Sequence, residues 1–286
     1  MIRSILVPID GSQSSSSALR IAASMAGLTD ARLIGLFVQD AQRFARIAPA
    51  DALAASIGAS PAVESPLPPK EMLEEEERVE AESQQLYQAF QDSCEQARVR
   101  GRFLCPRGEP EHEIIEAARM VDLVILGNRG KHSGAPHRSE GDTVFSVLHV
   151  VSRPVLVVPE EPEGLGRMVI AYDGSATSER ALRAAAELAT VAQFDEVHLI
   201  TAHDDPAAGE ELQRSAVHYL SSYELDTIAV VRAGDPKQVI IKYVEEVEAS
   251  ILALGAFGHN RILERIFGST TVSILQNTHA AVLLSS

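Results

Sequence analysis

The feature that most constrains the fold is an internal repeat. An apolar run ending in Asp-Gly-Ser occurs at Ile5–Ser12 and again at Met168–Ser175, and an alanine-rich stretch follows each copy. Three further matches occur in the same order: Gly108-Glu109-Pro110 with Gly234-Asp235-Pro236, Leu126–Gly130 with Leu254–Gly258, and Val155–Val158 with Val282–Leu284. Four matches in one order indicate that the chain contains two copies of one structural unit.

The repeat divides the chain of 286 residues into two domains of ordinary small size. We expect a first domain at 1–160 and a second at 165–286, joined by the linker Pro159–Gly164. Asp10 lies 117 positions before Gly127, whereas Asp173 lies 82 positions before Gly255, so the first copy carries an insert, at about 41–75. Prolines, alanines and serines there predict a loop or lid, with a short helix near 51–57.

Short apolar runs alternate with helical patterns in both copies. Expected strands are 2–9, 31–38, 101–106, 122–127, 154–158, 168–172, 196–202, 225–232, 250–255 and 280–285. Expected helices are 14–27, 70–100, 110–119, 142–150, 176–192, 207–222, 236–247 and 269–277. Continuous apolar strands alternating with helices are typical of parallel sheets buried on both faces. The predicted class is therefore α/β, with a doubly wound sheet in each copy.

A run of charge precedes the third strand of the first copy. Seven glutamates lie between Glu71 and Glu82. We interpret them as the solvated face of a long helix, whose inward face carries Leu86, Phe90 and Cys94.

Composition excludes several classes of function. A net charge of −15 disfavours nucleic acid as a partner. No apolar run approaches the roughly 20 residues that span a bilayer, and the start lacks the pattern of a signal peptide. Cys94 and Cys105 have no metal-ligand spacing, and His132 and His137 form no metal pair, so we expect no metal site of protein ligands. These features predict a cytoplasmic protein without a membrane partner.

A glycine-rich pattern follows the fourth strand of the second copy. Gly255-Ala256-Phe257-Gly258 precedes nine residues and then Gly268-Ser269-Thr270 at the start of a helix. In doubly wound folds, ligands lie beyond the carboxyl ends of the strands. Glycines let the backbone approach a ligand and adopt positive φ, and a helix start offers free N–H groups and hydroxyls. The pattern predicts a phosphate site, although a tight turn followed by an N-cap at Ser269 has the same residues.

This pattern resembles the ATP loop of the universal stress protein family. The Val7-Pro8-Ile9-Asp10-Gly11-Ser12 start and the Arg153–Val158 end of the first copy resemble that family too. The resemblance covers the chain apart from the insert. It implies five parallel strands per copy in the order 3-2-1-4-5, ATP as ligand, Mg²⁺ with the triphosphate, and pairing of the two copies through their last strands. It also allows a dimer of chains.

The resemblance assigns ligand positions residue by residue. In the second copy these are Ala171, Asp173, Ala202, Gly255, Gly258, His259, Asn260, Gly268, Ser269 and Thr270. For Asp173 a second interpretation stays open, in which the carboxylate only bonds the backbone N–H groups of its own turn.

The first copy departs from the pattern. Ten residues separate Gly130 from Gly141, and Asp142 and Thr143 follow where Ser-Thr is expected. The matched positions are Pro8, Asp10, Val38, Gly127, Gly130, Gly141 and Thr143. A carboxylate at Asp142 repels phosphate, whereas the basic loop residues Arg129, Lys131, His132, His137 and Arg138 offset that charge, bind another anion or are simply solvated.

The sequence therefore favours an ATP-binding stress-response or signalling protein, with the nucleotide mainly in the second domain. A scaffold with empty loops is one alternative. Slow ATP hydrolysis or autophosphorylation, at Ser269 or Thr270, is another. No Gly-x4-Gly-Lys-Ser/Thr loop is present, so efficient phosphoryl transfer is not expected and no catalytic residue is assigned.

Overall fold

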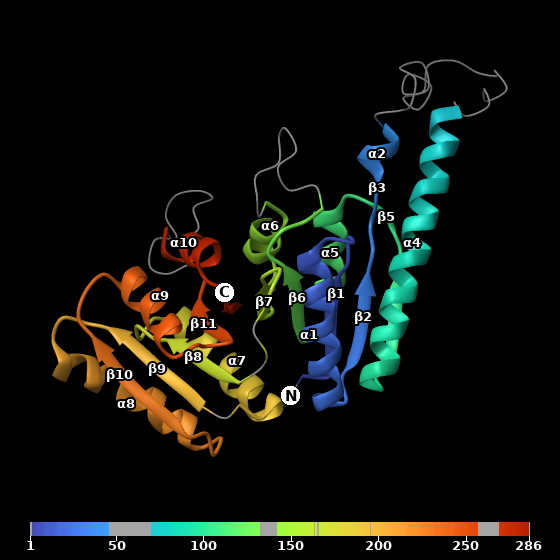
Figure 1. Cartoon of the computed structure of the whole chain (residues 1–286). Coiled ribbons are helices and arrows are strands. Elements are labelled where there is room, and N and C mark those ends of the chain that lie inside the picture. Colours follow the sequence, from blue (N-terminus) through green and yellow to red (C-terminus); the bar gives the residue numbers. More distant parts are fainter. Residues whose placement is uncertain are drawn as a thin grey trace.

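A single mixed sheet runs through the whole molecule in a computed structural model of the chain (Figure 1). The structure describes residues 2–45, 70–131, 142–162, 164, 166–194, 196–256 and 269–285. Within them, the sheet has ten strands in the order β10-β9-β8-β11-β12-β7-β6-β1-β2-β4. Numbered within each half, both halves have the order 3-2-1-4-5. The α/β class with a mostly parallel sheet is therefore confirmed.

The first half of the chain contributes one side of the sheet. Its strands are β1 (Ser4–Pro8), β2 (Arg32–Leu36), β4 (Gly101–Leu104), β6 (Leu123–Gly127) and β7 (Val155–Val158). Its main helices are α1 (Gln13–Thr29), α4 (Lys70–Ala97), α5 (Pro110–Ala118) and α6 (Asp142–Val150). The long helix ends three residues earlier than expected, and Arg98, with a φ of 55°, turns the chain toward β4.

The second half repeats the plan. Its strands are β8 (Arg167–Ala171), β9 (Glu196–Ala202), β10 (Thr227–Arg232), β11 (Ile251–Gly255) and β12 (Ala281–Ser285). Its helices are α7 (Ala176–Ala192), α8 (Pro206–Ser221), α9 (Pro236–Glu246) and α10 (Ser269–Asn277).

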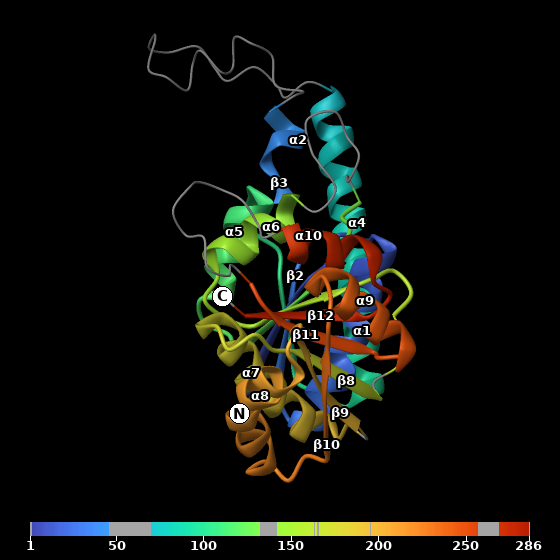
Figure 2. The same ribbon diagram turned by 90° about the vertical axis from the view of Figure 1, so that its left-hand side faces the viewer.

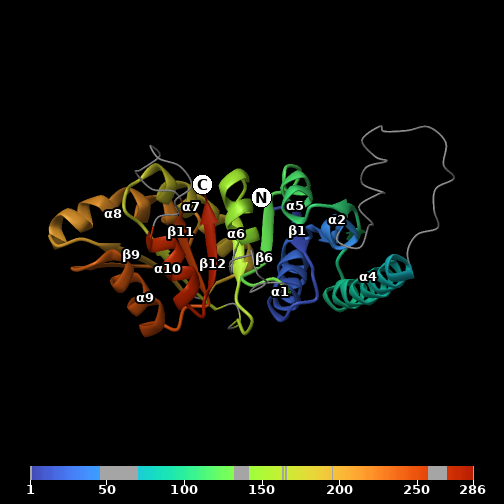
Figure 3. The same cartoon turned by 90° about the horizontal axis from the view of Figure 1, so that it is seen from above.

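Helices cover both faces of the sheet, and each face has its own core. One cluster of buried side chains joins α1, α4, α7 and α8 to the sheet, and a second cluster lies on the opposite face under α5, α6, α9 and α10. The view from above places the two halves side by side, with α4 and α8 toward opposite ends (Figure 3). Each cluster contains residues of both halves, so each core is continuous across the molecule.

The last strand of each half joins the two halves. β7 and β12 pair antiparallel, with Leu156 opposite Leu283, whereas every other pair in the sheet is parallel. The sheets of the two halves therefore form one continuous sheet, paired through the last strands as the resemblance implied. Both leucines are buried, so the join is part of the core and not a surface contact.

Short elements mark where the first half departs from the second. β3 (Gln39–Asp40) and β5 (Arg107–Gly108), which the sequence did not predict, form a two-stranded parallel sheet. α2 (Ala41–Ala45) follows β3 and lies beside the first turns of α4, as two views agree (Figures 1 and 2). The expected helix near 51–57 lies outside the described residues.

The Asp-Gly-Ser turns follow from backbone geometry. Gly11 and Gly174 have φ of 79° and 72°, the left-handed region that favours glycine. Ser12 and Ser175 then cap α1 and α7 by accepting from the N–H groups of Ser15 and Ser178. The repeated sequence thus encodes a repeated strand-to-helix turn.

Glycine is required at positions 127 and 255 for a reason other than the positive φ that the sequence pattern suggested. Neither has positive φ. A Cβ at Gly127 would stand 2.7 Å from the carbonyl carbon of Ser14, and one at Gly255 would stand 2.6 Å from the nitrogen of Ser178. Close packing of the strand end on the first helix of the same half, and not positive φ, therefore requires glycine at these positions.

We predict that Gly255→Ala destabilises the chain by about 1–3 kcal/mol, because the backbone of α7 must move to admit the methyl group. Urea unfolding should report a lower midpoint with an unchanged slope. Gly166→Ala is the matched control, since a Cβ there meets nothing within 4 Å. Equal effects at both positions would contradict the packing argument.

One histidine is buried in the second core. His198 on β9 is 5% exposed, and its Nδ1 lies 2.8 Å from the hydroxyl of Tyr243 on α9. Nε2 is buried and has no partner within the part of the chain that the structure describes. Burial, reinforced by Arg167 and opposed by Glu196, lowers the pKa of His198 below its ordinary value of 6.5. The neutral ring is therefore the form that the core accepts.

We predict that this histidine makes stability fall in acid. The depressed pKa means that the unfolded chain takes up the proton first, so stability is complete above about pH 6.5 and is lost as the pH falls below it, by up to about 1.4 kcal/mol per unit. The double variant His198→Ile/Tyr243→Phe removes both polar partners and should reduce the loss between pH 7.5 and 5.5. Tyr243→Phe alone keeps the histidine and should retain it; urea unfolding at both pH values checks this.

Candidate functional site

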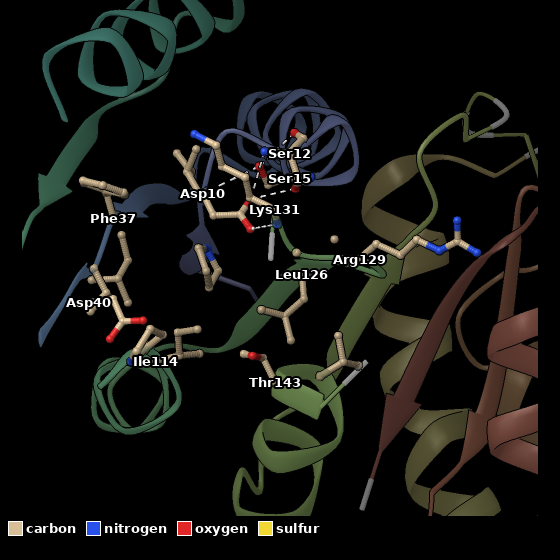
Figure 4. A pocket seen from close by; sticks show the side chains of 18 of the residues that line it. Asp10, Ser12, Ser15, Phe37, Asp40, Ile114, Leu126, Arg129, Lys131 and Thr143 are labelled. Carbon is tan, nitrogen blue, oxygen red and sulfur yellow. Dashed lines mark hydrogen bonds between the residues drawn. The ribbon is translucent and has the colours of Figure 1, made fainter. Parts of the chain in front are cut away.

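A cavity of about 160 Å³ lies beyond the carboxyl ends of β1, β2 and β6 (Figure 4). β1 lies between β2 and β6: the chain runs from β1 to β2 on one side, and after β4 it returns to form β6 on the other side. The strand order thus reverses beside β1, which is where doubly wound sheets bind ligands. The parallel sheet itself creates this opening, because the segments after β1 and β6 diverge from it in opposite directions.

Six of the seven positions expected for a ligand in the first half line this cavity. They are Pro8, Asp10, Val38, Gly127, Gly130 and Thr143. The seventh, Gly141, lies outside the described residues, as does the side chain of Asp142. Apolar side chains form much of the wall: Leu36, Val38, Ile114, Leu126 and Val144. An apolar slot next to a polar edge suits a flat, partly polar molecule.

Asp10 fixes the polar edge. Its Oδ1 accepts from the backbone N–H and the hydroxyl of Ser12, at 3.0 and 2.6 Å. Its Oδ2 accepts from the N–H of Lys131, at 2.7 Å. The carboxylate therefore joins the turn after β1 to the loop after β6, and it still lines the cavity. A Cβ at Gly130 would lie 3.1 Å from Oδ2, so a side chain there would crowd this contact.

The loop after β6 is held from the other side by α1. The hydroxyl of Ser14 donates to the carbonyl of Arg129 and accepts from its N–H, at 3.3 Å in the second case. The side chain of Arg129 extends away from Asp10 and Lys131 (Figure 4). Of the basic loop residues, Arg129 thus lines the cavity without directing its charge toward the Asp10 edge.

An ion-pair network from α4 reaches the rim of the cavity. One oxygen of Glu82 accepts from Nζ of Lys131, and the other accepts from Arg43 on α2 at 2.9 Å. Arg43 also donates to Glu75 at 2.8 Å. Arg43, Glu82 and Lys131 all line the cavity. The insert and the long helix therefore contribute directly to the site.

This network corrects our interpretation of the glutamate run. The side chains of Glu75 and Glu82 are only 12% and 16% exposed, so a fully solvated face is wrong for these two residues. Spacing contained the signal: Glu75, Val79, Glu82 and Leu86 recur at helical intervals and share one face. The inward positions of Leu86, Phe90 and Cys94 are confirmed, since all three are buried.

Glu82 stays charged in this setting. Burial acts to raise the pKa of its carboxyl, but hydrogen bonds and charges from Lys131 and Arg43 outweigh burial, and the pKa lies below its ordinary value. The cations Arg43 and Lys131 face two paired carboxylates, Glu75 and Glu82, while Asp10 and Asp40 add two more at the cavity. Among the described residues, this side of the cavity therefore has no surplus of positive charge.

Other polar groups of the cavity are available to a ligand. Oδ1 of Asn128 is buried and accepts no hydrogen bond from the described residues. Thr143 lies in the first turn of α6, where helix N–H groups favour a negative partner. With the apolar wall and the glycine edge, these groups can contact a flat, partly polar ligand.

In the second half, the described positions that were expected to bind a ligand lie at the carboxyl ends of the strands. Ala171 ends β8, Asp173 follows it, Ala202 ends β9 and Gly255 ends β11. Asp173 accepts from the N–H of Ser175 at 2.9 Å, so the turn-forming interpretation of this carboxylate holds, and it leaves the ligand interpretation open. Gly258, His259, Asn260 and Gly268 lie outside the described residues. Ser269 and Thr270 begin α10, but their side chains lie outside that part.

The described residues contain neither a candidate metal cluster nor a candidate membrane span. Among them, no group of three or more His, Cys, Asp or Glu side chains is placed to hold a metal ion. No helix of the described ranges is long and apolar enough to cross a membrane.

Comparison with protein families gives one consistent match. The model of the universal stress protein family matches residues 1–59, 48–159 and 164–285. The universal stress protein Slr1230 of Synechocystis sp. is 29% identical over 166 residues, which make up 57% of this chain and 57% of that protein. The chain therefore spans little more than half the length of this curated relative.

Solved structures agree with the fold over the whole chain. A universal stress protein from Archaeoglobus fulgidus has a TM-score of 0.71 at 22% identity, covering 99% of this chain and 98% of that one. A putative universal stress protein from Pseudomonas aeruginosa has a TM-score of 0.63 at 18% identity, covering 99% and 93%. At these identities the likeness concerns the fold.

Proposed function

The chain belongs to the universal stress protein family, and from that premise we propose that it binds ATP and acts as a nucleotide-dependent stress-response or signalling protein. ATP, with Mg²⁺, occupies the second half. Binding and release of the nucleotide, and not catalysis, are its role here. Partner proteins read the ligand-bound state.

One observation carries this proposal. In the first half, the positions expected for a nucleotide converge on a single cavity with an apolar slot and a polar edge. They come from three separate strand ends and from the first turn of α6, so their convergence is not a consequence of neighbouring sequence. The second half has the same strand order, the same Asp-Gly-Ser turn and the same close contact between its glycine and its first helix. The repeated framework supports a second site of the same design.

The second half has the better phosphate loop. Gly255, Gly258, Gly268, Ser269 and Thr270 match the spacing of the family's ATP loop, whereas the first half has an extra residue and Asp142. On this proposal Ala171 and Ala202 border the adenine, and Asp173 the ribose. The loop from Gly258 to Thr270, with His259 and Asn260, supplies N–H and hydroxyl groups to the phosphates.

A ligand of this kind changes the energy of the folded state. ATP that binds only the folded chain stabilises it by RT ln(1 + [L]/Kd), which is about 2.7 kcal/mol at a hundredfold excess over Kd. That amount is large enough to order a loop or shift a contact equilibrium. It therefore provides a signal without hydrolysis.

We predict one Mg·ATP per chain in native mass spectrometry of the freshly purified protein titrated with nucleotide. Gly258→Asp should abolish this binding, because the added carboxylate repels phosphate at close range. Gly164→Asp is the matched control: it adds the same charge on the exposed linker and should bind normally. An absence of binding at millimolar Mg·ATP would refute the proposal.

A further inference from the structure

One position of the helix that borders the cavity carries a charge in the first half and none in the second. Leu86 of α4 lies against Gly11, and Leu212 of α8 lies in the same way against Gly174, so the two leucines correspond. The next inward positions correspond as well: Phe90 with Ala216, and Cys94 with Leu220, all buried. One turn before these leucines, the first half has Glu82 and the second half has Ala208.

Glu82 already occupies two cations that line the first cavity, Lys131 and Arg43. Its two oxygens accept from Lys131 and Arg43, and its side chain is only 16% exposed. Lys131 is the residue directly after Gly130, where the family loop holds phosphate. An incoming phosphate must therefore displace a carboxylate that is already hydrogen-bonded in place. It must also lie near Asp10 and Asp40, which line the same cavity.

We propose that Glu82 is a built-in counter-anion that makes the first cavity a site for adenine nucleosides and nucleoside monophosphates, and excludes triphosphates. This inference rests on the proposed function, since it takes the cavity as a nucleotide-type site. The apolar slot and Asp10 serve base and ribose, which carry no charge. Each further phosphate meets Glu82 and an edge without surplus positive charge. The second half has Ala208 at this position and retains the triphosphate.

The measurement is calorimetry of the full chain carrying both Gly258→Asp and Ala202→Trp, with adenosine, AMP and Mg·ATP as probes. On the proposed function, the first substitution repels phosphate in the second half and the second fills the place of its base. We expect adenosine and AMP to bind at least about tenfold more tightly than Mg·ATP, because like charges at close range oppose the triphosphate. This comparison needs no change at Glu82. Mg·ATP binding as tight as adenosine, or no binding of any of the three, would overturn the inference.

Charge removal at Glu82 tests the cause. In the same background, Glu82→Gln should tighten Mg·ATP binding by about tenfold and change adenosine binding less than twofold. Glu82→Ala, which copies the second half, should act in the same direction and serves as the second variant if the amide perturbs folding. Glu77→Gln removes the same charge from an exposed position of α4 and should leave all three affinities unchanged. Equal effects of Glu77→Gln and Glu82→Gln would overturn the inference.

A double variant separates competition for Lys131 from a general loss of negative charge. Adding Lys131→Met to Glu82→Gln should cancel the gain for Mg·ATP, because the freed cation is then absent. A retained gain would contradict the assigned role of Lys131. The proposed function is judged separately, in the chain with Gly258 intact. Failure of ATP binding there, with adenosine selective in the first cavity, would reject the function and keep this inference.

Discussion

The antiparallel pair of β7 and β12 is the contact on which the molecule depends. It closes the two open edges that the halves would otherwise expose, and it does so in the middle of the sheet. Because Leu156 and Leu283 lie buried at its centre, the cores on both faces continue from one half into the other. An exposed edge of apolar strands is a template for association with other chains. Here β7 and β12 pair with each other within the chain, so β4 and β10 are the edge strands of the sheet.

Much of this architecture could be predicted from the sequence, because the pattern repeats. Continuous apolar runs such as Leu123–Leu126 are buried strands, and the Asp-Gly-Ser turns begin helices as expected. The short β3 and β5 pair could not be predicted, since two residues per strand carry no periodicity. The reason why glycine is required at positions 127 and 255 could not be predicted either. Only the approach of a helix backbone, which is a tertiary contact, explains it.

The positions that line the candidate site could be predicted from the sequence, but its ion pairs could not. Asp10, Val38 and Thr143 converge as the repeat and the strand order require. Arg43 and Glu82 were missed, because a run of glutamates resembles a solvated face when charges are counted one by one. The helical interval that places Glu82 beside Val79 and Leu86 was visible, but its partners come from the insert and from the loop after β6. A pairing between distant segments has no local pattern.

Covalent fusion of the halves has a consequence for how the strand ends of each half can change. In a symmetric assembly of identical subunits, every substitution appears at all equivalent sites at once. In this chain Glu82 borders one cavity, while Ala208 stands at the matching place in the other half, within the same sheet. Substitutions can therefore alter the strand ends of one half without altering those of the other. A single molecule of this design can therefore carry different charges at its two sets of strand ends, while one shared core connects them.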